Sequence, residues 1–226
     1  MLQALNKIDP ILWKTISQPK ESAIWKNAPQ DHDDWNTWWK KQFDNYSFLS
    51  NRVVTNYIEI GCGPYAKNTV NILNTLSKQP ETIYLNDPLI MEYLKENKSI
   101  AKLVNKNTSI VPTPLEEINL ECQMDCVVCI NVLDHVYDLD LCLEKLYSIT
   151  ATNGIIILGQ DLTDNVDHMK NKQEDFDYTH PIRFDLAYLE EFLSKFQTIY
   201  RKVLDRADGR NPNSHYATLL YCGEKI

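Results

Sequence analysis

Apolar and polar positions follow one another along most of the chain in blocks that are typical of alternating strands and helices. Short apolar runs rich in Val, Ile and aromatic residues predict buried strands, and segments with apolar residues three to four apart predict amphipathic helices. Strands are expected at about residues 53–60, 82–86, 109–111, 125–130 and 155–159, and helices at about 67–77, after Pro88 and at about 139–150. Because strands and helices alternate, a parallel sheet with helices on both faces is predicted.

The last third of the chain departs from this alternation. After a polar stretch over 160–180, the pattern predicts a helix at 185–196 and strand-like runs at 198–204 and 215–222. Only the polar segment 205–214 separates these runs, so we expect them to pair as an antiparallel hairpin. The predicted fold class is therefore α/β: a doubly wound, mostly parallel seven-stranded sheet with an antiparallel C-terminal hairpin.

Aromatic residues dominate a segment that precedes the first strand. Five of them recur at helical spacing and fall on one stripe: Trp35, Trp38, Trp39, Phe43 and Tyr46. We expect one amphipathic helix that packs mainly on the domain, with Trp38 or Trp39 left to line a pocket as part of a lid. Residues 1–226 are predicted to form a single domain, in which 1–50 are a helical N-terminal extension or lid and 51–226 are the α/β core.

Composition removes several classes of function. The chain has 31 acidic and 23 basic side chains and a formal charge of −8, which argues against a nucleic acid partner. It has no run of about 18 apolar residues and no basic leader, so we expect a soluble, cytoplasmic protein without a membrane span. Cys126 and Cys129 fall in an apolar strand, where positions three apart face opposite sides, so reduced cysteines rather than a redox or zinc pair are expected.

The first strand runs into a glycine-containing loop. Gly61 and Gly63 permit a sharp turn and a close approach of a ligand to the backbone, and Glu59 stands two residues before the first of them. Asp87 lies 26 residues after Gly61, at the end of the next strand, where a carboxylate can accept hydrogen bonds from both hydroxyls of a ribose. This pattern resembles the E/D-x-G-x-G motif of class I S-adenosylmethionine-dependent methyltransferases, which have a Rossmann-like fold. One departure is Tyr65, which replaces the third glycine of the family pattern.

The resemblance extends in order from about residue 53 to residue 159. Thr113-Pro-Leu-Glu116 is similar to the segment that lines the adenine, and Asn131-Val-Leu-Asp-His-Val136 is similar to the loop after the fourth strand. It implies S-adenosyl-L-methionine as the cofactor. The residues that the resemblance assigns to its site are Glu59, Gly61, Gly63, Tyr65, Asp87, Leu115, Glu116 and Asn131.

Methyl transfer is an in-line displacement, and a hydroxyl acceptor must also lose a proton. The fold is expected to bring His135, Asp161 and His180 to the carboxyl edge of the sheet, and these are the candidate catalytic residues. Asp161 and Asp164, with Asp167 and His168 beyond them, form either a solvated acidic loop or a site for a divalent ion such as Mg²⁺.

Aromatic side chains near the start of the chain and polar side chains at the predicted rim suit a carbohydrate, because aromatic faces stack on sugar rings and carboxylates bind hydroxyls. The Glu21-x-x-x-Trp25 start, the Gly61-Cys-Gly-Pro-Tyr65 loop and the Gly159-Gln-Asp-Leu-Thr163 stretch also resemble methyltransferases of glycan assembly. This resemblance implies O-methylation of a sugar hydroxyl on a glycan or on an acceptor derived from a nucleotide sugar. Other small molecules are the alternative acceptors. A nicotinamide-dependent oxidoreductase and a binding protein without chemistry are the alternative functions.

Overall fold

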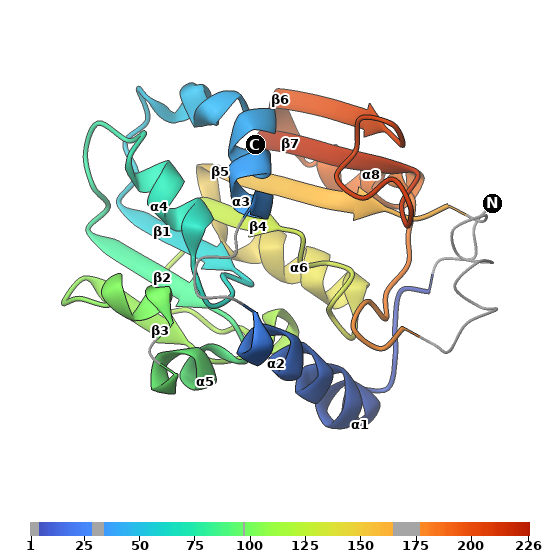
Figure 1. Ribbon diagram of the computed structural model, residues 1–226. Coiled ribbons are helices and arrows are strands. Elements are labelled where there is room, and N and C mark those ends of the chain that lie inside the picture. Colours follow the sequence, from blue (N-terminus) through green and yellow to red (C-terminus); the bar gives the residue numbers. More distant parts are fainter. Residues whose placement is uncertain (1–4, 29–33, 97, 165–176) are drawn as a thin grey trace.

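A mixed seven-stranded sheet forms the centre of the protein (Figure 1). The structure, a computed structural model, describes residues 5–28, 34–96, 98–164 and 177–226. The strand order is β3-β2-β1-β4-β5-β7-β6. The strands are β1 (Asn56–Ile60), β2 (Thr82–Asn86), β3 (Thr108–Val111), β4 (Met124–Ile130), β5 (Thr150–Leu162), β6 (Phe196–Asp205) and β7 (Ala217–Lys225). The first five run parallel, while β7 pairs antiparallel with both β5 and β6, which confirms the predicted fold class and the terminal hairpin.

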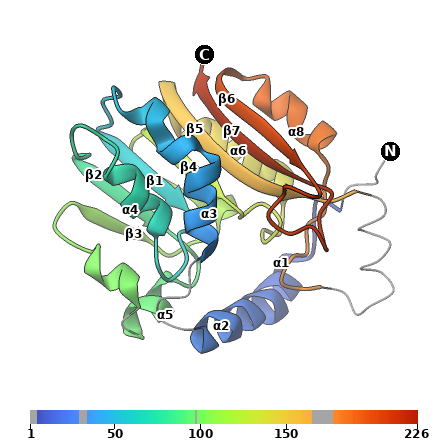
Figure 2. The same cartoon turned by 45° about the horizontal axis from the view of Figure 1, so that its top comes forward.

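Helices cover both faces of this sheet (Figure 2). They are α3 (Asp34–Gln42), α4 (Lys67–Leu73), α5 (Ile90–Lys95), α6 (Leu139–Ile149) and α8 (Leu186–Leu193), with short 3₁₀ turns η3 (Ser99–Lys102) and η4 (Leu115–Glu117) between strands. Helices α6 and α8 pack on one apolar core and α3, α4 and α5 on the other. In β4, Cys126 belongs to one core and Cys129 to the other, as the strand period predicts, and all six cysteines are free.

A helical run from Pro10 to Asn27 crosses the carboxyl ends of the parallel strands (Figure 1). It consists of α1 (Pro10–Leu12), a π-helical turn η1 (Trp13–Ser17) and α2 (Gln18–Asn27). The Asp9 carboxylate caps its start by accepting hydrogen bonds from two backbone amides of the first turn. Among the described residues, no helix has the length and apolar character needed to cross a membrane.

The aromatic stripe does not lie on one continuous helix, so that prediction is wrong. Helix α3 ends at Gln42, because Asp44, Asn45 and Tyr46 adopt left-handed φ values of 50°, 53° and 59°. The chain continues as the 3₁₀ turn η2 (Asp44–Leu49). Phe43 and Tyr46 nevertheless reach the core, and the side chain of Trp35 lies outside the described part of the structure.

Strand β5 is longer than the five residues predicted for it. It pairs with β7 from Ile155 through Leu162, and this antiparallel partner carries it past Gly159. Gln160 and Asp161 therefore lie inside the strand. The polar stretch that was expected to begin at Gln160 starts only after Leu162, which changes where Asp161 can act.

Candidate active site

A cavity of about 400 Å³ lies between α2 and the carboxyl ends of β1, β2 and β4. This volume is within the range of about 300–1,000 Å³ typical of small-molecule sites. In a doubly wound sheet, ligands bind outside the carboxyl ends of the strands, where the strand order reverses. Ten residues that the sequence assigns to the site line this one cavity: Glu59, Gly61, Gly63, Tyr65, Asp87, Leu115, Glu116, Asn131, His135 and His180.

The glycine loop, residues 61–66, forms the floor of the cavity. Gly61 has a φ of +60°, and a Cβ on it would lie 2.5 Å from Cγ2 of Val132. Gly63 has a φ of +58°, but a Cβ there meets no protein atom within 4 Å. The first glycine is therefore required by packing against the loop after β4, whereas the second leaves open space at the cavity floor.

Glu59 is buried at the end of β1, lines the cavity and holds the start of α4. Its carboxylate accepts hydrogen bonds from the side-chain amide of Asn68 at 3.1 Å, from the backbone amide of Thr69 at 2.9 Å and from the Thr69 hydroxyl. Asn68 and Thr69 belong to the first turn of α4, where backbone amides lack helical partners and favour a negative charge. Glu59 thus fixes the start of α4 relative to β1 and shapes the loop between them.

Tyr65, the departure from the family glycine pattern, packs against the helix that covers the cavity. Its ring meets Trp25 of α2 edge to face, with the centroids 5.9 Å apart. Trp25 donates a hydrogen bond of 2.7 Å from Nε1 to Glu21, and its carbonyl accepts one from Lys98. The large side chain in the loop therefore joins the cavity floor to α2.

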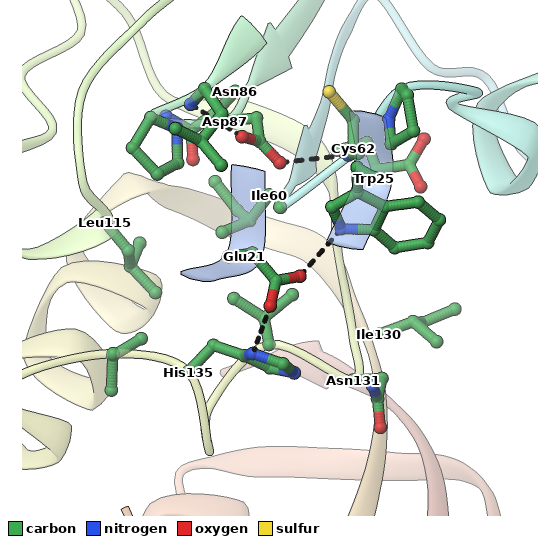
Figure 3. Close-up of a pocket in the computed structure, with 18 of the residues that line it drawn as sticks. Glu21, Trp25, Ile60, Cys62, Asn86, Asp87, Leu115, Ile130, Asn131 and His135 are labelled. Carbon is green, nitrogen blue, oxygen red and sulfur yellow. Dashed lines mark hydrogen bonds and ion pairs between the residues drawn. The ribbon is translucent and has the colours of Figure 1, made fainter. Parts of the chain in front are cut away.

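Asp87 lies at the end of β2 and faces the same cavity (Figure 3). Its carboxylate accepts hydrogen bonds from the amides of Gly63 at 3.0 Å and Leu89 at 2.8 Å. Burial raises the pKa of Asp87 to about 7, although these two amides lower it in part. The neighbouring Asn86 side chain donates to the carbonyls of Val111 and Thr113, which ties the end of β2 to β3.

Leu115 and Glu116 form the wall of the cavity beyond β3. Both are buried. Oε1 of Glu116 accepts hydrogen bonds from the amides of Tyr137 at 2.6 Å and Asp138 at 3.0 Å, while its Oε2 is buried without a partner. Burial raises the pKa of this carboxyl group.

His135 and His180 meet at the other end of the cavity, with ring centroids 4.5 Å apart. Nδ1 of His135 lies 3.8 Å from the Glu21 carboxylate, a contact drawn in Figure 3, and its Nε2 lies 3.8 Å from Asp134. Nδ1 of His180 lies 2.9 Å from the Asp177 carboxylate. Burial alone lowers the pKa of His180, but the carboxylates of Asp177 and Asp134 outweigh it, so the pKa is raised.

Asp161 is not at this end of the cavity, and its expected position in a loop after the fifth strand is wrong. Its side chain is fully buried inside β5 and does not line the cavity. The Thr218 hydroxyl donates to one oxygen at 2.7 Å, and Nε and Nη2 of Arg210 both donate to the other at 2.8 Å. Arg210 also donates to the Asn131 side chain at 2.8 Å and lies over the Trp39 ring. Asp161 therefore reaches the cavity only through Arg210.

The other candidates lie apart from this arrangement. Asp164 is 3.9 Å from Arg206 and does not line the cavity. Asp167 and His168 fall outside the described residues. Of the two tryptophans expected in a lid, Trp39 is buried but lines the cavity, whereas Trp38 does not line it.

The cavity is also lined by Glu21, Trp25 and Arg210, none of which the sequence assigned to the site. Trp25 and Glu21 are four residues apart on α2, a helical spacing that could have marked a shared face. Nothing in the sequence around Arg210 distinguishes it from other charged residues of a hairpin loop. Its place follows from the pairing of β7 with β5.

Comparison with known proteins agrees with this architecture. Residues 58–158 match the family model of a methyltransferase domain. No curated protein matches the chain significantly. Among solved structures, N-methyltransferase NodS from Bradyrhizobium japonicum WM9, in complex with S-adenosyl-L-homocysteine, is similar with a TM-score of 0.66 and 16% identity over 92% of this chain and 97% of that one.

Two further solved structures have the same fold. Magnesium protoporphyrin IX methyltransferase (ChlM) from Synechocystis PCC 6803 has a TM-score of 0.64 and 10% identity, over 96% of this chain and 99% of that one. The 1,6-didemethyltoxoflavin-N1-methyltransferase of Burkholderia thailandensis has a TM-score of 0.55 and 12% identity, over 96% and 88%. This chain therefore has the Rossmann-like methyltransferase fold, with a methyltransferase domain match over residues 58–158.

Proposed function

We propose that the protein is an S-adenosylmethionine-dependent methyltransferase whose donor occupies the cavity beneath α2. The observation that carries this proposal is that the glycine loop, Asp87 and the 115–116 segment, which are distant in sequence, line one cavity in the methyltransferase fold. The methyltransferase domain match over residues 58–158 supports the same reaction class.

The site suggests one orientation of the donor. The Asp87 carboxylate accepts hydrogen bonds from the ribose hydroxyls, as an acidic residue at the end of the second strand does in doubly wound folds. The adenine then lies toward Leu115 and Glu116, and the methionine part lies over Gly61 and Gly63. This orientation directs the sulfonium methyl group toward Asn131 and the two histidines. Glu59, which also lines the cavity, supports the loop under the methionine part of the donor.

We further propose that the acceptor is a hydroxyl group of a carbohydrate. The acceptor end of the cavity combines the aromatic ring of Trp13, which donates to the His135 carbonyl, with the polar side chains of Glu21, His135 and His180. Aromatic rings can stack on sugar rings, and the polar groups can bind hydroxyls. The imidazole pair activates the acceptor oxygen, which forms a bond to the methyl carbon as the carbon–sulfur bond breaks. The electron pair of that bond stays on sulfur, and the hydroxyl proton passes to bulk solvent.

Transfer of a labelled methyl group from S-adenosylmethionine to a panel of acceptors tests this function. The panel contains sugars and glycan termini, and beside them phenols, carboxylates and amines. We expect labelled sugar products that are base-stable, as ethers are. An Asp87→Ala variant serves as the control, because it should lose donor binding and therefore transfer to every acceptor.

A non-sugar small molecule is the second candidate acceptor. It is favoured by two of the similar solved structures, which are named as a magnesium protoporphyrin IX methyltransferase and a 1,6-didemethyltoxoflavin-N1-methyltransferase. Label that appears only on an amine, phenol or carboxylate would refute the sugar proposal and retain the methyltransferase.

A further inference from the structure

Three potential metal ligands converge at the acceptor end of the cavity. Asp134, His135 and His180 each offer one ligand atom, and these three atoms lie within 4.8 Å of one another. Asp134 is buried, whereas both imidazoles line the cavity. They come from two segments, the loop after β4 and the segment before α8, so the fold and not a local motif brings them together.

Two of these side chains, His180 and Asp134, are held by a further polar group. The Asp177 carboxylate lies 2.9 Å from Nδ1 of His180, so Nε2 is the ring nitrogen left to bind an ion. Gln160 donates to Oδ1 of Asp134 at 3.0 Å. Histidine ligands of metals commonly give their other ring nitrogen to a carboxylate, which orients the ring and makes it a stronger ligand. The Asp177–His180 pair has this arrangement.

We propose that Asp134, His135 and His180 bind a divalent transition-metal ion, such as Co²⁺ or Zn²⁺, on the acceptor side of the donor cavity. Two imidazoles and one carboxylate suit such ions, whereas Mg²⁺ prefers oxygen ligands alone. Ligand atoms on one such ion lie roughly 3–3.5 Å apart, so any two of the ligand atoms must approach by at most about 1.8 Å. Three protein ligands leave a coordination position for a substrate oxygen.

This inference rests on the proposed function only for what the ion does, not for its binding. An ion held here faces the cavity through both histidines, and a hydroxyl bound to it has a lower pKa than a free hydroxyl. The imidazoles then act on the acceptor through the ion, and the hydroxyl proton leaves to bulk solvent.

The other carboxylates considered from the sequence are less suited to an ion. The charge of Asp161 is already balanced by Arg210, and both of its oxygens accept hydrogen bonds. Asp164 lies near the positive charge of Arg206. Asp164 therefore provides a control, because its substitution removes an acidic side chain but changes none of the three proposed ligands.

The test is a titration of the full chain with Co²⁺, followed by calorimetry and by the visible absorption of the bound ion. We expect one ion per chain. His180→Gln and Asp134→Asn should weaken binding by about a hundredfold or more, and Asp177→Asn by about 10- to 100-fold. Asp164→Asn should bind as the unaltered chain does. Because Asp134 is buried and its variant can fail to fold, the more accessible His180 and Asp177 variants decide the result.

Binding of S-adenosylhomocysteine, measured on the same samples, separates this inference from the proposed function. No bound Co²⁺, or equal Co²⁺ binding in the His180→Gln and unaltered chains, overturns the metal site even if S-adenosylhomocysteine binds. Loss of the ion in Asp164→Asn instead of His180→Gln overturns it too. Stoichiometric ion binding that depends on His180 and Asp177 supports it, whether or not the donor product binds.

Discussion

The two glycines of the cavity floor should respond differently to the same substitution. Gly61→Ala places a methyl group 2.5 Å from Cγ2 of Val132, whereas Gly63→Ala places one where no protein atom lies within 4 Å. Both positions have φ near +60°, so both variants carry the same backbone strain. Any difference in stability between them therefore measures the packing of the loop against Val132.

The expected losses of stability have two sources, the backbone strain and the contact with Val132. A left-handed conformation costs a residue with a Cβ about 1–2 kcal/mol, and this is all that Gly63→Ala should lose. Overpacking adds about 1–3 kcal/mol, so Gly61→Ala should lose about 2–5 kcal/mol. The new methyl group at position 63 points into the donor cavity and should weaken S-adenosylhomocysteine binding at least tenfold, or about 1.4 kcal/mol.

Urea denaturation measures the stabilities and calorimetry the affinities. Val132→Ala removes both methyl groups that the new Cβ of Gly61→Ala would strike. The stability loss of the double variant Gly61→Ala/Val132→Ala should therefore be about 1–3 kcal/mol smaller than the sum of the losses of the two single variants. Equal stability losses at positions 61 and 63, together with additive effects in the double variant, would refute the geometry given for this loop.

Three further predictions concern the walls of the cavity. Because the pKa of Asp87 is raised to about 7 and its ionised form is the better acceptor of ribose hydroxyls, S-adenosylhomocysteine should bind about tenfold more tightly at pH 8 than at pH 6. In the same calorimetric titrations, an Asp87→Asn variant should bind weakly at both pH values. Arg210→Met leaves the buried charge of Asp161 unpaired, so it should lower the free energy of unfolding by about 3–5 kcal/mol, measured by urea denaturation. Adding Asp161→Asn should recover part of this loss, and an unchanged urea midpoint in Arg210→Met would contradict the prediction. Trp25→Ala removes the ring that packs on Tyr65, so S-adenosylhomocysteine should dissociate about ten times faster in stopped-flow displacement. The rate of Trp25→Phe should be nearer to that of the unaltered chain, and equal rates in all three proteins would count against a covering role for α2.

The elements of the donor side could be predicted because their signals are local. Gly61 and Gly63 mark a turn by themselves, Glu59 is two residues away, and Asp87 follows one helix and one strand later. The alternation of strands and helices then fixes where these residues meet, since the carboxyl ends of parallel strands share one edge.

Features that depend on distant partners could not be predicted in this way. The extent of β5 is set by its antiparallel partner β7, and this is why Asp161 lies inside a strand instead of a loop. The same pairing brings Arg210 to the cavity. Of the three left-handed residues that end the aromatic helix, Asp44 and Asn45 are of types that adopt this conformation more readily than most. Tyr46 is not, and it is held there by packing and by Asn68.

Measuring donor binding directly is the sharpest test of the central claim. Calorimetric titrations of the full chain with S-adenosylhomocysteine and with NADH separate a methyltransferase donor site from a nicotinamide site in the same cavity. The structure predicts one S-adenosylhomocysteine per chain, no measurable heat with NADH, and loss of S-adenosylhomocysteine binding in Asp87→Ala. Binding of NADH alone, or normal S-adenosylhomocysteine binding by the Asp87→Ala variant, would contradict the donor site described for this cavity.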